Sequence, residues 1–291
     1  MNMKRFARPL AALLLASLCA GCGARSAPAE ETPPPAPEVT AAPAREGFTA
    51  EILSTGKSDC AVLTMDGLVI LSDTADEDDY PAIAARLREA GASRIDYIIL
   101  SHYDKDHIGA AARLIREFEV GAVLRPDYVE ESAEYFALIK AEAASGTQVE
   151  ILTGYYYIRT ENGLITVDPP DEDYGDDNNN SALTTVTYRG RSLLFAGDAR
   201  KKRMEEFLRT APGDIDFIKL PHHGDGNKAL YSLLRSCSPK WAVATVSEAE
   251  VIEPELTELL DKLGVTLYRT CDGPVSVVWE GEGFSVRQDA A

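Results

Sequence analysis

The chain has 291 residues, of which 45% are hydrophobic and 26% are charged, so wholesale disorder and collagen-like repeats are excluded. This length suffices for one large domain or two small ones, with a substantial buried core. Against 29 Lys and Arg stand 47 Asp and Glu, which gives a formal net charge of −18. A surface this acidic repels phosphate backbones, which argues against binding of extended duplex nucleic acid.

The first 22 residues have the pattern of an export signal. Basic residues without any acid precede an apolar run at 10–19, which is about half of the roughly 20 residues that span a membrane. The small residues before Cys22 resemble the lipobox of bacterial lipoproteins, which implies cleavage there and lipid on the Cys22 sulfur. The alternative is an ordinary soluble signal peptide. We expect an exported protein anchored by lipid to the outer face of the cytoplasmic membrane, or on the periplasmic side.

Residues 23–47 are rich in Pro and Ala and are predicted to form a disordered tether. Such a segment cannot bury enough apolar surface to offset the entropy lost on ordering. Cleavage before Cys22 would leave 26 basic and 47 acidic residues, a net charge of 26 − 47 = −21. The predicted folded domain is 48–291. Its three cysteines are an odd number and are predicted to be buried single thiols: Cys60, Cys237 and Cys271.

Strands and helices alternate along the predicted domain. The first two strands are expected to form a hairpin that turns at Asp66-Gly67. Strand pairs near both ends, with strand–helix units between them, favour an α/β fold of two mixed sheets covered by helices. Strands are predicted at 60–63, 68–71, 95–100, 122–124, 149–152, 164–167, 183–188, 192–195, 217–220, 241–245, 265–268 and 275–279, and helices at 80–90, 110–118, 132–144, 201–208, 229–234 and 253–263.

The four histidines of the chain fall into two clusters, each in a predicted loop between a buried strand and a helix. In the first cluster, His102 and His107 flank Asp104 and Asp106. Four potential ligands within six residues indicate a metal site, because a loop at a strand end can aim several side chains at one point. The second cluster is His222-His223.

A third segment places Asp198 directly after an apolar strand and Gly197. Alone, an Asp at such a position is more often a helix N-cap than a ligand. The glycine, however, permits a sharp turn and a close approach of the backbone to a site. Together with the histidine clusters, Asp198 becomes a candidate metal ligand.

These motifs resemble those of the metallo-β-lactamase superfamily. The family motif H-x-H-x-D-H is here His102-x-Asp104-x-Asp106-His107, with Asp in place of the second His. That replacement is similar to the ComEC-like branch, named for the hydrolase domain of a bacterial DNA-uptake protein. The resemblance covers 48–286 and implies an αββα sandwich with two divalent metal ions at one edge of its sheets. Further segments carry it: Thr55–Cys60, Leu71–Thr74, Asn178–Ser181, Gly197-Asp198 and Leu220–Gly224.

The resemblance implies a ligand set for both ions. His102 and Asp104 would hold the first ion, Asp106 and His107 the second, and a bridging carboxylate and one further His would complete the site. The first ion normally takes another His from the motif that is Asn-rich here, which leaves that ion with a ligand-poor, oxygen-rich site. The implied metal ligands are His102, Asp104, Asp106, His107, Asp198 and His223.

The resemblance also implies roles around these ligands. His222 would be a neighbour of the site or a proton donor, although the assignments of His222 and His223 could be reversed. Asp73 would orient the ligand loop from behind. Substrate or the outer ligand sphere would be contacted by Asn180, Ser181, Lys105 and Thr270. A solvated side chain is the favoured interpretation for Lys105.

The implied chemistry is hydrolysis by a hydroxide that bridges the metal ions, with Asp106, Asp198 and His222 as the catalytic residues. Abundant carboxylates favour manganese, whereas the imidazoles also suit zinc. The first substrate class is a phosphodiester: a nucleotide, a short nucleic acid or a cell-envelope polymer. β-Lactams are disfavoured because a histidine is missing. The alternative is a non-catalytic surface lipoprotein that binds metal or ligand in a degenerate site.

Overall fold

The computed structural model describes residues 47–290. The predicted signal segment 1–22 with the lipidation site Cys22, and nearly all of the predicted tether 23–47, lie outside the described residues. The position predicted for the domain boundary therefore stays a prediction. Within the part of the chain that is described, no helix is both long and apolar enough to traverse a lipid bilayer.

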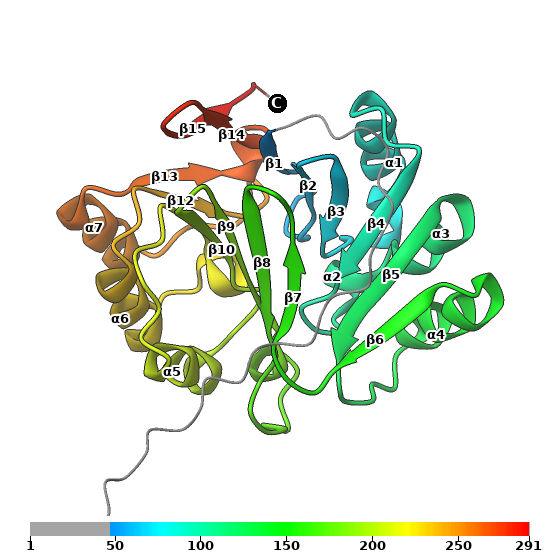
Figure 1. The fold of residues 1–291 in the computed structure, drawn as a ribbon. Coiled ribbons are helices and arrows are strands. Elements are labelled where there is room, and N and C mark those ends of the chain that lie inside the picture. Colours follow the sequence, from blue (N-terminus) through cyan, green and yellow to red (C-terminus); the bar gives the residue numbers. More distant parts are fainter. Residues whose placement is uncertain (1–46, 291) are drawn as a thin grey trace, which may run out of the picture. The chain divides into compact units, whose positions relative to one another are not determined.

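Two mixed β-sheets pack face to face and helices cover both outer faces, which confirms the predicted αββα class (Figure 1). The eight-stranded sheet has the order β15 (Gly283–Gln288), β14 (Val275–Glu280), β1 (Phe48–Ile52), β2 (Ala61–Met65), β3 (Leu68–Ser72), β4 (Arg94–Ile99), β5 (Glu119–Pro126) and β6 (Gln148–Leu152). The seven-stranded sheet has the order β13 (Thr266–Arg269), β12 (Trp241–Ala244), β11 (Phe217–Lys219), β10 (Arg191–Phe195), β9 (Leu183–Tyr188), β8 (Gly163–Asp168) and β7 (Tyr156–Arg159).

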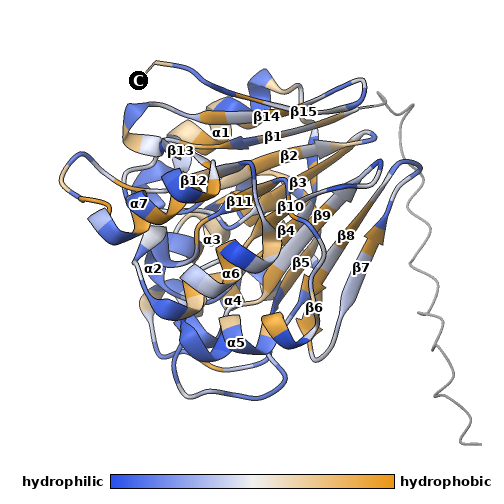
Figure 2. Ribbon diagram, turned by 90° about the vertical axis from the view of Figure 1, so that its left-hand side faces the viewer, coloured by the Kyte–Doolittle hydropathy of each residue, from blue (hydrophilic) through white to orange (hydrophobic). Residues whose placement is uncertain are grey.

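Each sheet has its own set of helices. Beside the eight-stranded sheet lie α1 (Tyr80–Glu89), α3 (Ala111–Glu117) and α4 (Ala133–Ser145), and beside the other lie α5 (Lys201–Arg209), α6 (Lys228–Cys237) and α7 (Pro254–Leu263). Figure 2 shows hydrophobic residues concentrated on the strands and hydrophilic ones on the outward helix surfaces. Apolar side chains therefore form three layers, one between the sheets and one beneath each set of helices.

The direction of the strands determines where the polar loops meet. In the eight-stranded sheet β3, β4, β5 and β6 run parallel, and in the other β10, β11, β12 and β13 do the same. The carboxyl ends of parallel strands lie at one edge of a sheet, which is where α/β proteins place their sites. The loops after β3, β4, β10, β11 and β12 converge at such an edge.

The sequence pattern locates most elements within two or three residues, with informative exceptions. The predicted strand 183–188 coincides with β9. The edge strand β15 has a largely half-exposed pattern and carries too few buried residues to be recognised. The first histidine loop is not irregular throughout, because Lys105–Ile108 forms the short helix α2. His107 is therefore presented by a helical turn.

Helix α5 is fixed to the sheet by a fully buried arginine. The Arg203 guanidinium donates to the carbonyl oxygens of Ser181 (2.9 Å) and Asp168 (2.5 Å) and pairs with the carboxylate of Glu206 (3.0 Å). Asn179 Oδ1 in turn accepts from the backbone N–H groups of Lys202 and Arg203 at the start of the helix. These bonds hold the Asn-rich segment 178–181 against α5.

Replacing Arg203 with Met should destabilise the fold by about 3–5 kcal/mol, because the buried carboxylates of Glu206 and Asp168 would lose the cation that pairs with both. Urea denaturation followed by circular dichroism measures this. The control is Lys201→Met on the exposed side of the same helix, where a change of about 0.5 kcal/mol or less is expected. A loss below about 1 kcal/mol for Arg203→Met would contradict this account.

Candidate metal centre

Three imidazoles from both sheets aim their Nε2 atoms at one carboxylate. His107 Nε2 lies 3.3 Å from Asp198 Oδ1, and His223 Nε2 lies 3.2 Å from Asp198 Oδ2. His102 joins His107 and Asp198 in a group whose candidate ligand atoms all lie within 4.8 Å of one another. A second such group consists of Asp106, His107 and His223. The two predicted histidine clusters and Asp198 are therefore brought together in space.

Several atoms of this cluster lack any hydrogen-bond partner. Within 47–290, the fully buried side-chain atoms without a partner include His102 Nε2, His107 Nε2 and Asp198 Oδ1. Buried polar atoms are almost always paired, so three such atoms at one point indicate a place for a ligand between them. Imidazole nitrogen and carboxylate oxygen suit zinc and other divalent cations. The residues present thus fit the metal that the motifs predict, without fixing the number or identity of the ions.

The first histidine loop is held from behind by Asp73. The Asp73 carboxylate accepts from Ser101 N–H and from Ser101 Oγ–H, both at 2.8 Å, and contacts His107 Nδ1 at 2.9 Å. Ser101 Oγ lies 3.0 Å from His102 Nδ1. Asp73 therefore lies where the sequence comparison expects it, and these contacts leave the Nε2 atoms of both imidazoles free.

The turn after β10 brings Asp198 against this loop. Gly197 has a positive φ of 50°, and a Cβ at this position would lie 2.6 Å from Ser101 Cβ. Only glycine allows this close approach of the two sheets. The Asp198 N–H donates to Ser181 Oγ at 3.2 Å, so Ser181 orients the turn.

The second histidine cluster turns its two rings in different directions. His222 and His223 both have left-handed backbone angles, with φ values of 48° and 57°. His223 is buried beside Asp198, whereas His222 is partly exposed, with Nδ1 3.1 Å from Asp225 Oδ2 and Nε2 4.0 Å from Asp198 Oδ2. The geometry thus places His223 among the candidate ligands and His222 beside them on the open side.

The two carboxylates of the first loop are partly exposed at the mouth of the cluster. Asp104 Oδ2 is 3.4 Å from His102 Nε2, and Asp106 Oδ2 is 3.7 Å from His223 Nε2. Lys105 points elsewhere and pairs with Asp76 at 3.0 Å, in agreement with its interpretation as a solvated side chain.

The carboxylates and imidazoles of the cluster shift each other's pKa values toward the charged forms. Burial alone would raise the pKa of Asp198, but the imidazoles of His107 and His223 hold it well below its usual range. Burial opposes a charge on His107, yet the carboxylates of Asp198, Asp59 and Asp73 raise its pKa well above the ordinary value. In the absence of metal, the imidazoles therefore act as the counter-charges of the carboxylates.

Three residues expected around the ligands or in contact with substrate are buried and hydrogen-bonded to the protein itself. Asn180 is buried, its amide accepting from Tyr174 N–H and donating to Asp173. Thr270 is buried and binds the backbone of Val246. Ser181, as described, supports the turn at Asp198. The member of the Asn-rich run that faces the site is Asn178: with its amide nitrogen toward the first loop, it lies 3.2 Å from Asp104 Oδ2.

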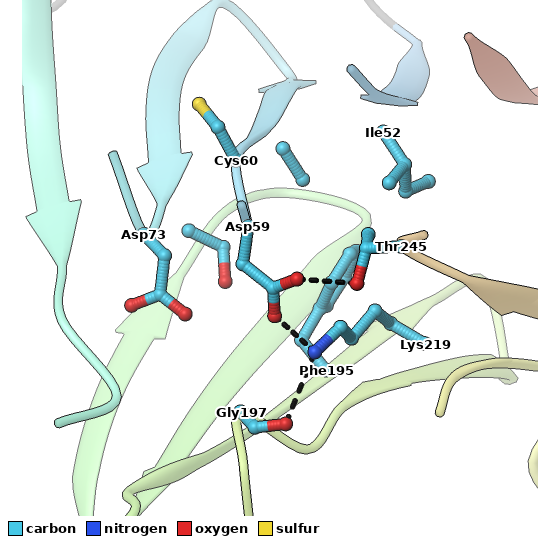
Figure 3. A pocket seen from close by; sticks show the side chains of 10 residues that line it. Ile52, Asp59, Cys60, Asp73, Phe195, Gly197, Lys219 and Thr245 are labelled. Atoms are coloured by element: carbon cyan, nitrogen blue, oxygen red, sulfur yellow. Dashed lines mark hydrogen bonds and ion pairs between the residues drawn. The ribbon is translucent and has the colours of Figure 1, made fainter. Parts of the chain in front are cut away.

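Sequence reasoning missed a second set of buried polar residues near the candidate ligands, which Figure 3 shows. Asp59 precedes β2, Lys219 ends β11 and Thr245 follows β12, and all three side chains are buried. The sequence could have indicated Lys219, because it is a single basic residue inside the apolar run Phe217–Leu220. Its partner Asp59 is 160 residues away, and no local pattern could have paired the two.

Two helix-covered mixed sheets, with imidazoles and carboxylates gathered at their common edge, define an α/β protein with a candidate metal centre. The chain belongs to the metallo-beta-lactamase superfamily, whose family model matches residues 54–240.

Curated relatives are competence proteins. The chain is 24% identical over 189 residues to ComE operon protein 3 of Bacillus subtilis, a match that covers 63% of this chain and 24% of the relative. It is 26% identical over 195 residues to competence protein ComA of Neisseria gonorrhoeae, covering 65% of this chain and 26% of the relative. These relatives agree with the ComEC-like branch predicted from the motifs. The match spans only about a quarter of their length.

Solved structures share the fold at low identity. YhfI of Bacillus subtilis, described as a metallo-beta-lactamase fold protein, has a TM-score of 0.57 at 12% identity, covering 81% of this chain and all of YhfI. CmlA, a diiron beta-hydroxylase from Streptomyces venezuelae, has a TM-score of 0.51 at 16% identity, covering 77% of this chain and 53% of CmlA. At this level of identity, the structural similarity concerns the fold alone, that is, the arrangement of sheets and helices.

Replacing Asp198 with Ala should remove most of the metal that copurifies with the protein, because its carboxylate faces the Nε2 atoms of both His107 and His223 at the candidate metal centre. Elemental analysis of the purified variant measures this loss. Asp261→Ala, on the exposed surface of α7, is the control and should retain the metal content of the wild type. Equal metal in Asp198→Ala and wild type would disprove the site.

Proposed function

We propose that the protein is an exported, lipid-anchored, metal-dependent hydrolase of phosphodiesters. The substrate classes that we favour are a nucleotide, a short nucleic acid and a cell-envelope phosphodiester. The observation that carries the enzymatic part is the set of buried, unpartnered ligand atoms from His102, His107 and Asp198. Export and anchoring depend on the signal pattern before Cys22.

Divalent cations held by this cluster would supply Lewis acidity and activate water, and either zinc or manganese suits its nitrogen and oxygen donors. The protein's contribution is to hold the imidazoles with Nε2 inward. It also keeps the Asp198 carboxylate ionised.

A group of hydrogen-bond donors at the mouth supports an anionic substrate. The Arg200 guanidinium lies with Nη2 3.3 Å from His222 Nε2, and both border the amide of Asn178. Asn178 and His222 in turn adjoin the candidate ligands Asp104 and Asp198. Arginine binds phosphate oxygens with paired, charge-assisted hydrogen bonds. On so acidic a protein, a cation at this position favours a small phosphodiester over a neutral substrate.

His222 and Arg200 are held side by side at the mouth by Asn178. With its amide nitrogen toward Asp104, the Asn178 oxygen accepts from His222 Nε2 and from the Arg200 guanidinium, each at 3.2 Å. The other ring nitrogen of His222, Nδ1, lies 3.1 Å from Asp225 Oδ2. Asn178 therefore orients both groups in the resting site.

The competing function is a surface lipoprotein that captures metal or ligand without turnover. One observation favours the capture protein. The ligand group around His102 has the Asn178 amide beside it, where the resemblance implies a further histidine. Turnover separates the two functions, because a capture protein would bind metal yet release no product.

Manganese- or zinc-loaded protein should hydrolyse bis-p-nitrophenyl phosphate, and Asp106→Ala should reduce the rate by at least about 100-fold. Mutation of a residue that only contacts a metal ligand typically lowers metal affinity or activity about 10–100-fold. Asp106 is itself a candidate ligand, so a loss at the upper end of this range or beyond is expected. Release of p-nitrophenol measures the rate, with Asp261→Ala as the control. Metal-loaded wild type without turnover of any phosphodiester would favour the capture protein.

Replacing Arg200 with Gln should lower kcat/KM for phosphodiesters about 10–100-fold, because a charged hydrogen bond contributes about 1.5–3 kcal/mol. Metal content should not change, since Arg200 is not among the candidate ligands. The matched control is Arg209→Gln, at the exposed end of the same helix, which should keep the wild-type kinetics. Unchanged kcat/KM in Arg200→Gln would exclude this role for the guanidinium.

A further inference from the structure

A buried ion pair between Lys219 and Asp59 joins the two sheets (Figure 3). The Lys219 ammonium, from the seven-stranded sheet, pairs with Asp59 Oδ2, from the loop that leads into β2 of the eight-stranded sheet. The same ammonium donates to the carbonyl oxygen of Gly197 at 3.1 Å and lies 3.6 Å from Asp198 Oδ1. Both side chains of the pair are buried, so neither charge can be neutralised by solvent.

The second oxygen of Asp59 continues the chain of contacts toward a candidate ligand. Thr245 Oγ1 donates its hydrogen to Asp59 Oδ1 at 2.5 Å and lies 3.0 Å from His223 Nδ1. A hydroxyl has one hydrogen, so Thr245 can only accept from the His223 ring. The Asp198 carboxylate, 3.2 Å from Nε2, favours the hydrogen of a neutral His223 on that atom. Thr245 Oγ1, together with Asp59 Oδ1 at 3.4 Å from Nδ1, favours the hydrogen on Nδ1, which leaves Nε2 with the electron pair that a metal requires.

Asp73 makes the corresponding contacts on the other sheet. Its carboxylate contacts His107 Nδ1 directly and accepts from the Ser101 hydroxyl, which adjoins His102 Nδ1. A carboxylate behind each ring nitrogen is the usual device that orients metal-binding imidazoles. For His223 the carboxylate is Asp59, and it acts across the interface between the sheets.

We propose that Lys219, Asp59 and Thr245 form a relay that positions His223 for metal binding, with the Lys219 ammonium as a permanent internal cation. This inference rests on the metal binding in the proposed function. The three residues are positioning residues, since they would act through His223.

The ammonium has a second consequence for Asp59. Asp59 offers an oxygen within 4.8 Å of ligand atoms of Asp198 and His223, so its carboxylate could itself serve as a ligand. The contact with Lys219 engages one oxygen of that carboxylate and the Thr245 hydroxyl engages the other. Lys219 thus keeps Asp59 behind the imidazole and out of the ligand set.

The central test compares Thr245→Val, which removes the hydroxyl at nearly constant volume, with Thr245→Ser, which retains it. Metal-free protein labelled with ¹⁵N-histidine reports the tautomer of His223, at a pH above the measured titration of that ring. Zinc titration against a competing chelator reports affinity. Thr187→Val, the same substitution on β9 away from the site, is the matched control.

The relay predicts an Nδ1–H tautomer of His223 in the wild type and loss of that preference in Thr245→Val. Zinc affinity should fall about 10–100-fold in Thr245→Val, recover in Thr245→Ser and remain at the wild-type value in Thr187→Val. A Thr245→Val protein with the wild-type tautomer and affinity would overturn the proposal. If the wild type bound no metal, the proposed function would fail, while the tautomer measurement would still decide on the relay.

The role of the cation is tested by Lys219→Met alone and together with Asp59→Asn. The single variant leaves a buried carboxylate without its partner, so the metal-free protein should have a lower Tm than the wild type. The double variant removes both charges and should recover part of that Tm, but not the zinc affinity, because the hydrogen bond from Thr245 loses its charged acceptor. Equal Tm values for the single and the double variant would refute a charge role for Lys219.

Discussion

The structure depends on the compensation of buried charge at one edge of two sheets. Asp59, Asp73 and Asp198 are buried there within reach of the imidazoles of His107 and His223 and the ammonium of Lys219. An isolated charge in such a place would be prohibitively unfavourable, so each group is tolerated only because the others are present. The opposing charges also fix the positions of the loops that carry them. Charge compensation and the geometry of the site are therefore one constraint.

This constraint explains the unusual backbone of the site. Asp73, His222 and His223 all have positive φ values, which cost free energy for residues with a side chain. Such conformations persist where the surroundings determine them from several directions, and here they aim side chains from two sheets at one point. The hydrophobic layer between the sheets supplies the rigid support, since the strands that precede each loop are buried on both faces.

The sequence was sufficient for the fold class, most strands and helices, and the residues that face the candidate metal centre. Those features are visible locally: hydrophobic periodicity marks the strands, and His and Asp cluster at strand ends. Asp59, Thr245 and Arg200 were missed because their roles are set by partners distant in sequence, such as the 186 residues between Asp59 and Thr245. For Asn180 and Thr270 the motif indicated only the segment, and the direction of each side chain became visible in the structure, where both are hydrogen-bonded to the protein itself.

The Asn-rich segment shows how a departure from the family pattern changes the chemistry. The motif resemblance implies an imidazole at the Asn-rich run; this chain places the Asn178 amide beside Asp104 instead, and Asn179 and Ser181 are bound by α5 and its buried Arg203. The group around His102 and the group of Asp106, His107 and His223 each combine two imidazoles with one carboxylate, and Asp104 adds an oxygen 3.4 Å from His102 Nε2. Hard cations such as manganese prefer oxygen, whereas zinc accepts imidazole readily. A cation bound beside His102 and Asp104 would therefore lie close to Asn178 and Arg200 at the mouth, where an anionic substrate could supply a further oxygen ligand.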